Sequence, residues 1–116
     1  MKRRFRLTRE TDFQRVRRFG KSYAHPLIVL VAFPNQLDYS RVGVAAGRTV
    51  GKAVRRNRAK RLLRATIQPL LGEIITGWDI LLVARVHMST ASFTQTLEAV
   101  LTLLRRARLI REPYES

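Results

Sequence analysis

The sequence contains no cysteine and only two histidines, His25 and His87, which lie far apart along the chain. Without cysteine the chain forms no disulfides and no thiolate metal sites, and the two histidines lack the spacing of metal ligands. Acidic residues are also scarce and scattered, with 8 Asp and Glu against 23 Lys and Arg. Hydrolysis of a phosphodiester would need clustered carboxylates that hold two metal ions, or a histidine positioned as a general base. The sequence therefore predicts no catalytic residues, no metal site and no small-molecule cofactor in this chain.

Long hydrophobic runs are absent as well. The longest apolar run, residues 27–33, is far shorter than the roughly 20 residues that span a bilayer. The basic first residues lead into polar residues rather than into the apolar core of a signal peptide. We therefore expect a cytoplasmic protein with no membrane partner.

Positive charge is the dominant feature of the composition, because the 116 residues carry a formal net charge of +15. A protein with that much self-repulsion is expected to bind a polyanion, and nucleic acid is the first candidate. Hydrophobic residues make up 46% of the chain, which is enough for one modest core. We expect a single domain over residues 1–116, with short flexible tails at 1–5 and 111–116.

Hydrophobic periodicity and breaker residues divide the chain into helices and strands. In order, they are a helix over 9–19 capped by Thr8, strands over 27–33 and 41–46, a basic helix over 53–68, a strand over 78–84, and a helix that begins after Ser92. The strands 27–33 and 41–46 are predicted to form a hairpin across a polar turn. Gln95 follows Ser92 with the spacing of a capping box. The order αββαβα implies a layered α+β domain.

Three acidic residues have simple structural interpretations. Glu10 and Asp12 fall in the first turn of the first helix, where carboxylates complement the helix dipole. Asp79 opens a strand, and we expect it to make a local hydrogen bond to the backbone.

The basic segment 50–65 reads VGKAVRRNRAKRLLRA and contains no acid. At about 100° per residue, apolar side chains gather on one arc of this helix and cations on the opposite arc. The apolar arc comprises Ala59, Leu62, Leu63, Thr66, Ile67 and Leu70. The opposite arc comprises Asn57, Arg58, Lys60, Arg61 and Arg64. One side of the helix is therefore predicted to pack and the other to face outward.

A charged helix face is usually a solvated surface that is stabilised by ion pairs between neighbouring turns. This helix has no acid within one turn to make such pairs, and each like-charge pair at that spacing destabilises a helix by roughly a few tenths of a kcal/mol. Folding alone would not favour the arrangement, so we interpret the face as a nucleic-acid-binding surface. Guanidinium groups suit phosphate, and an amide such as Asn57 suits a 2′-hydroxyl or a base edge.

Residues 50–64 also resemble the signature of the protein subunit of bacterial ribonuclease P, whose Arg-Asn-Arg core is found here at 56–58. Further similarities are Arg6-Leu7, Asp12-Phe13, Val16 and Gly20 near the N-terminus, Arg41-Val42-Gly43 before the motif, and the apolar strand that begins at Asp79. The resemblance covers residues 6 to about 108.

This resemblance implies a single-domain α/β sandwich in which helices flank a mixed sheet, with a left-handed crossover, although such crossovers are almost always right-handed. It also implies a function. A protein of this family would bind the catalytic RNA of ribonuclease P and the 5′ leader of precursor tRNA, and would support endonucleolytic removal of the leader. The chemistry would belong to the RNA and to Mg²⁺ held mainly by the RNA, so the protein would be the non-catalytic subunit of an endoribonuclease.

The resemblance also implies two sets of RNA-binding residues. The surface that faces the catalytic RNA would comprise Arg48, Lys52, Arg55, Arg56, Asn57, Arg58, Lys60, Arg61 and Arg64. The leader cleft, between the first helix and the open face of the sheet, would comprise Phe13, Arg17 and Val31. Members often carry aromatic residues at the last two positions, so the stacking surface would be smaller here. On its residues alone, Phe13 is more typical of a core position.

Two other functions stay open on the sequence. A non-enzymatic RNA-binding protein of the ribosomal-protein type would share the size, charge and layout of this chain. A DNA-binding domain could use residues 53–68 as a recognition helix in the major groove. However, Arg and Lys crowd the whole outer arc, which fits phosphate contacts better than base reading.

Overall fold

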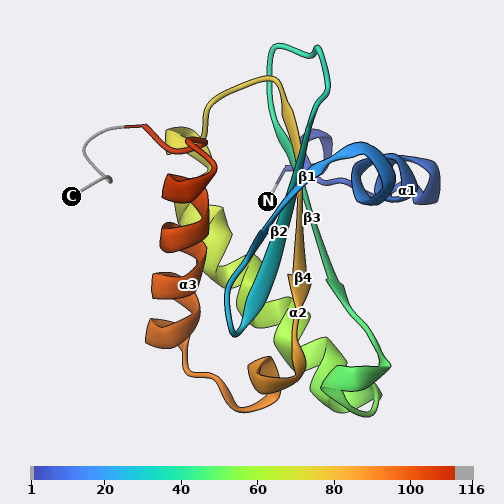
Figure 1. Cartoon of the computed structure of the whole chain (residues 1–116), viewed down its shortest axis with the longest axis vertical. Helices are drawn as coiled ribbons and strands as arrows, with labels where there is room; N and C mark the ends of the chain where they lie inside the picture. Colours follow the sequence, from blue (N-terminus) through green and yellow to red (C-terminus); the bar gives the residue numbers. More distant parts are fainter. Residues whose placement is uncertain (1, 112–116) are drawn as a thin grey trace.

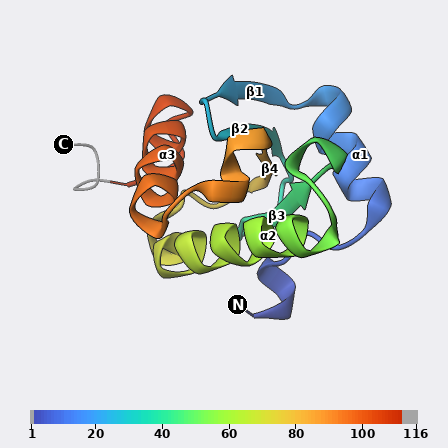
Figure 2. The same cartoon turned by 90° about the horizontal axis from the view of Figure 1, so that it is seen from below.

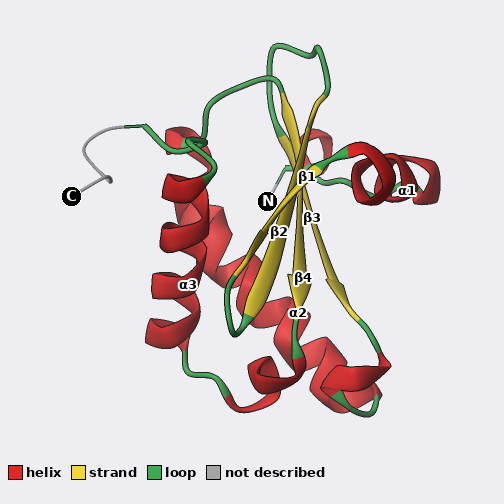
Figure 3. Ribbon diagram, viewed as in Figure 1, coloured by secondary structure: helices red, strands yellow, loops and turns green. Residues whose placement is uncertain are grey.

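A computed structural model describes residues 2–111 and shows three α-helices and a four-stranded sheet in that part of the chain (Figures 1 and 3). The helices are α1 (Glu10–Phe19), α2 (Ala53–Ile67) and α3 (Phe93–Arg106). The strands are β1 (Lys21–Ala24), β2 (Ile28–Pro34), β3 (Arg41–Ala46) and β4 (Trp78–Ala84). Short 3-10 helices are η1 (Arg3–Phe5), η2 (Arg48–Val50), η3 (Gln68–Glu73) and η4 (Val86–Thr90). None of the helices in residues 2–111 is long and apolar enough to cross a bilayer.

The sheet is mixed, with the strand order β1-β2-β4-β3. β2 pairs antiparallel with both β1 and β4, whereas β3 pairs parallel with β4. The chain passes from β3 to β4 through α2, and Figures 1 and 2 together show that this crossover is left-handed. The mixed sheet, the flanking helices and the left-handed crossover that the resemblance implied are thus confirmed.

The predicted hairpin between the strands 27–33 and 41–46, which are β2 and β3 in the structure, is wrong. β4 lies between β2 and β3, and the hairpin partner of β2 is β1, a strand that the sequence did not indicate. β1 has the sequence KSYA and lies at the edge of the sheet with three of its four residues exposed. An exposed edge strand needs no apolar alternation, so hydrophobic periodicity could not reveal it. Periodicity also reports burial but not which strands pair.

The sequence predicted the start of α3 correctly but placed the N-cap of α1 one residue too early. The capping box at the start of α3 is confirmed: Gln95 N donates to Ser92 Oγ at 3.1 Å, and Ser92 N donates to Gln95 Oε1 at 3.0 Å. At the start of α1 the N-cap is Arg9 rather than Thr8, without a side-chain cap.

The predicted N-terminal tail is partly ordered. Residues 3–5 form η1, and Leu7 N donates to Val42 O at 2.9 Å, so the segment that follows η1 lies along the outer edge of β3. Residue 1 and residues 112–116, which complete the two predicted tails, lie outside the described residues.

The sheet separates two hydrophobic layers of unequal size. α2 and α3 cover one face of the sheet and α1 crosses the other (Figure 2). The larger layer lies under α2 and α3 and includes Leu30, Leu63, Leu82 and Leu104. The smaller layer has four buried members, Leu7, Val16, Val31 and Leu81. α1 therefore packs on a small core, and most of its residues remain exposed to solvent.

Candidate RNA interface

Helix α2 divides its residues between core and solvent much as the sequence predicted. Ala59, Leu63, Thr66 and Ile67 are buried, and Leu62 is half-buried. On the outer side, five of the predicted RNA-binding residues are exposed: Arg48, Lys52, Arg55, Asn57 and Arg61. Arg56, Arg58, Lys60 and Arg64 are half-buried at the two borders of the helix. The outer face of α2 is therefore a cationic surface with one amide in it.

Arg58 does not face outward as the sequence predicted. Its guanidinium donates to three backbone carbonyls of the segment after β4, at 3.4 Å to Met88 O, 3.3 Å to Ser89 O and 3.0 Å to Ala91 O. A guanidinium has five N–H donors in a fixed fork, which suits such a cluster of carbonyls. Arg58 thus ties η4 to α2, a structural use that a helical wheel could not show because its partners lie 30 residues or more away in sequence.

A groove runs along the outer edge of β3 between α1 and α2. One part of it, of about 230 Å³, is lined by Arg6, Leu7, Thr8, Phe13, Val42, Gly43, Val44 and Arg64. The adjoining part, of about 240 Å³, is lined by Glu10, Phe13, Arg17, Val44, Ala45, Ala46 and Lys60. Phe13 and Val44 line both parts, so we treat them as one surface, the β3-edge groove. This groove brings the predicted cleft residues Phe13 and Arg17 together with Lys60 and Arg64 of the basic helix.

Phe13 is neither a core residue nor a free ring. It is half-buried, packs against the smaller hydrophobic layer and lines the groove with the rest of its surface. The ring lies over β3 at Gly43, where an added Cβ would approach two ring atoms to 2.9 Å. The absence of a side chain at Gly43 is therefore what allows the ring to approach the strand this closely.

The other two predicted cleft residues are placed differently. Arg17 is exposed and lines the groove. Val31 is only 5% exposed and belongs to the layer beneath α1, so its side chain has little surface to offer a ligand. Its leader-binding role was carried over from a position that often holds an aromatic ring, and a valine is too short to reach past the helix.

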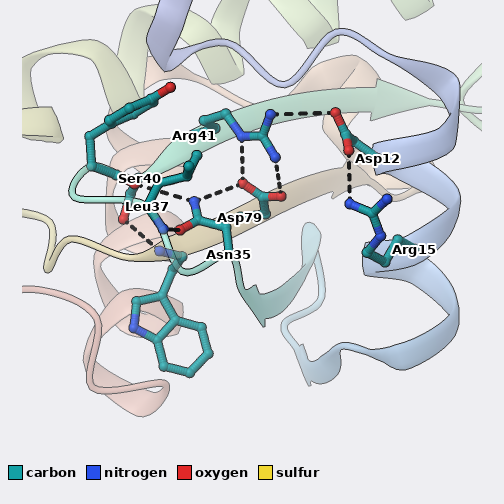
Figure 4. Close-up of polar contacts among 9 residues, drawn as sticks. Asp12, Arg15, Asn35, Leu37, Ser40, Arg41 and Asp79 are labelled. Carbon is teal, nitrogen blue, oxygen red and sulfur yellow. Dashed lines mark hydrogen bonds and ion pairs between the residues drawn. The ribbon is translucent and has the colours of Figure 1, made fainter.

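An ionic network joins α1 to the sheet beside the groove (Figure 4). Arg41 donates to Asp79 through two nitrogens, at 2.8 Å from Nε to Oδ1 and 2.7 Å from Nη2 to Oδ2. Arg41 Nη1 also reaches Asp12 Oδ2 on α1 at 3.4 Å, and Asp12 Oδ1 accepts from Arg15 Nη1 at 3.0 Å. The hydrogen bond to Asp79 raises the pKa of the Arg41 guanidinium above its ordinary value. The network fixes α1 at one position over the strands.

Sequence reasoning missed this network. Asp79 does not make the predicted local backbone bond: its carboxylate is 2% exposed and accepts from Arg41 and from Asn35 Nδ2, the latter at 3.0 Å. Asp12 stands in the first turn of α1 as predicted, but it also pairs across to the sheet. An acid at the start of an otherwise apolar, buried strand needs a cationic partner. This requirement was the feature of the sequence that could have predicted the network.

Residues 2–111 contain no group of three or more His, Cys, Asp or Glu side chains placed to hold a metal ion. The largest clusters of charge in the groove and on α2 are cationic instead.

Comparisons with known proteins identify the family. The family model described as Ribonuclease P matches residues 1–108. A ribonuclease P protein component from Herpetosiphon aurantiacus is 38% identical over 109 residues, which cover 94% of this chain and 89% of the relative. One from Clostridioides difficile is 37% identical, over 86% of this chain and 89% of the relative.

Solved structures agree with the sequence relatives. The RNase P protein from Thermotoga maritima superposes with a TM-score of 0.78 at 35% identity, covering 87% of this chain and 96% of that one. The RNase P protein from Staphylococcus aureus superposes with a TM-score of 0.83 at 27% identity, covering 92% and 98%. With the match running through the basic helix and the groove alike, the chain belongs to the family of ribonuclease P protein components.

Proposed function

We propose that this protein is the RNA-binding, non-catalytic subunit of a ribonuclease P that removes the 5′ leader of precursor tRNA. The observation that carries the proposal is the β3-edge groove, in which Phe13 and Arg17 of α1 face Lys60 and Arg64 of α2. A half-buried ring beside four cations, of Arg6, Arg17, Lys60 and Arg64, is the combination that binds single-stranded nucleic acid. Such a reaction belongs in the bacterial cytoplasm, where precursor tRNA is made.

The two predicted surfaces take different parts of the RNA in this proposal. The outer face of α2, with Arg55, Asn57 and Arg61, contacts the catalytic RNA, because its cations are spread in the manner that suits phosphates. The groove takes the unpaired leader, because it borders that face and contains the ring of Phe13. Both surfaces include residues of α2, so leader and catalytic RNA are held in a fixed relation.

The chemical step is assigned to the RNA. The groove presents cations and one ring, and its single acid, Glu10, stands alone, so these residues position and neutralise RNA rather than cleave it. Mg²⁺, which would supply Lewis-acid assistance to phosphodiester hydrolysis, is held mainly by phosphates of the RNA subunit in this proposal.

The test is reconstitution. The protein is mixed with a bacterial ribonuclease P RNA and a 5′-extended tRNA at low Mg²⁺, and products are mapped at nucleotide resolution. We expect cleavage at the mature 5′ end that depends on both components. Cleavage that is no faster with the protein than without it would contradict the subunit assignment, and cleavage by the protein alone would contradict the assignment of the chemistry.

Matched variants connect the assay to the groove. Lys60→Gln and Arg64→Gln should each reduce cleavage at limiting protein, because each removes a cation beside the leader. Arg108→Asn removes a cation that follows the C-terminal end of α3 and lines neither part of the groove, and asparagine tolerates the positive φ of 57° at that position. This control should cleave like wild type.

A further inference from the structure

A separate hollow of about 570 Å³ lies between η1, the loop that joins β2 to β3, and η3. Val42 is the one residue that its lining shares with the β3-edge groove. Its volume falls within the range of sites that bind small molecules or single nucleotides. We call it the η1 cavity.

Two aromatic rings form one corner of the η1 cavity. The centroids of Phe5 and Tyr39 are 5.8 Å apart, and their planes meet at 72°. Both residues are half-buried, and neither belongs to the two hydrophobic layers that stabilise the sheet. The rings therefore retain surface for a flat ligand, which would lie against one ring and meet the edge of the other.

Cations surround this aromatic corner. The Arg4 guanidinium carbon lies 4.7 Å from the centroid of Phe5 and 5.5 Å from that of Tyr39. Lys2 and Arg111 also line the cavity, against one acid, Asp38. The ligand that matches this lining is flat and carries negative charge.

Polar groups complete the lining. Gln68 and Thr76 are exposed at the mouth and can bond the edge of a base. The Ser40 hydroxyl is already engaged, because it donates to Ile75 O at 2.6 Å and accepts from Trp78 N at 3.0 Å. Ser40 therefore holds the loop that carries Tyr39 in place rather than meeting a ligand.

We infer that the η1 cavity binds one unpaired nucleotide of single-stranded RNA, with its base against Phe5 and Tyr39 and its phosphate beside Lys2, Arg4 and Arg111. Stacking on aromatic rings next to cations is how proteins hold unpaired bases without reading their sequence. The inference rests on the proposed function only in taking RNA as the polyanion that is bound. Leader binding in the β3-edge groove does not require it.

The first test uses a short unstructured RNA oligonucleotide and the whole protein. The Phe13→Ala background removes the ring of the groove, and the cavity is then followed through its own ring signals, to which the cations of α2 do not contribute. We expect the ring NMR signals of Phe5 and Tyr39 to shift on titration. Phe5→Leu and Tyr39→Leu, which keep apolar bulk but lose the rings, should each raise the dissociation constant by about tenfold or more.

A matched control and a cationic variant accompany these changes. Tyr23→Leu removes another ring with a cation over it, since Lys21 Nζ lies 5.5 Å from its centroid, but this ring is on β1 outside the cavity. It should leave oligonucleotide binding unchanged. Arg4→Gln keeps both rings and should reduce the slope of log binding constant against log salt concentration by about one unit, as expected for one lost phosphate contact. This variant keeps the test valid if a ring variant folds poorly.

Binding experiments with two larger RNAs show whether the catalytic RNA or the precursor tRNA supplies the nucleotide. Tyr39→Leu should weaken binding either of the catalytic RNA alone or of a 5′-extended tRNA in its presence. Wild-type binding of all RNAs by the Phe5, Tyr39 and Arg4 variants, with ring signals that do not move, would overturn the inference. Ring signals that shift in a protein unable to support cleavage would instead refute the proposed function and leave the cavity assignment in place.

Discussion

The two faces of the sheet are built differently. The face under α2 and α3 holds most of the buried side chains, whereas the face under α1 holds four, and there an ionic network from Arg41 fixes the helix. Hydrophobic burial tolerates small shifts, but a bidentate guanidinium–carboxylate contact has a defined geometry. The comparison indicates that one face supplies stability and the other supplies a fixed but accessible position for α1 beside the groove.

The largest expected difference comes from truncating one residue on each face. Leu82 is fully buried under α2 and α3, so Leu82→Ala should lower the free energy of unfolding by about 2–5 kcal/mol. Val83, the next residue on the same strand, is half-buried on the α1 face, and Val83→Ala should cost about 1 kcal/mol. Urea denaturation measures both. Equal losses would show that the two layers contribute alike.

The ionic network gives the next effect. Asp79→Asn replaces a carboxylate that is 2% exposed and leaves Arg41, itself 22% exposed, without its bidentate partner. We expect a loss of about 1–3 kcal/mol in the free energy of unfolding. We also expect weaker binding of leader-bearing tRNA, because α1 loses its anchor. Leaderless tRNA serves as the control, and a loss of stability with unchanged leader binding would separate the network from the groove.

Two arginines of α2 sharpen the comparison further. Arg58→Ala should destabilise the fold by about 1–2 kcal/mol, because it leaves three backbone carbonyls without their donor. Arg61→Ala should leave stability unchanged and reduce the salt dependence of binding to the catalytic RNA by about one phosphate contact. Thermal melts and a salt titration distinguish the two. If the two variants behave alike in both, the assignment of Arg58 to the fold is wrong.

Sequence reasoning succeeded where a signal is local. The strand 78–84, the capping box of Ser92 and the apolar arc of α2 all follow from spacing within one element. It failed where the partner lies far along the chain. The pairing of β3 with β4, the contacts of Arg58 and the bond between Arg41 and Asp79 each join residues about 30 or more positions apart. Periodicity carries no information about such distances.

The candidate site shows the same division. The outer face of α2 could be predicted, since a helix with no neutralising acids is an anomaly visible in the sequence. The groove could be predicted only in part, because Phe13 and Arg17 are recognisable on one helix while Lys60 and Arg64 reach it from another. The placement of Val31 beneath α1 depends on where the helix crosses the sheet, which the sequence does not specify.

The most direct measurement of the leader groove compares Phe13→Ala with wild type in binding leader-bearing and leaderless tRNA, in the presence of the catalytic RNA. We predict that affinity for leader-bearing tRNA falls by roughly 1–3 kcal/mol, the scale of one lost base stack, while leaderless tRNA is affected far less. The free energy of unfolding should fall by less than the roughly 3–5 kcal/mol that truncation of a core phenylalanine costs. Equal weakening for both tRNAs, together with a core-sized loss of stability, would contradict the assignment of this groove to the leader.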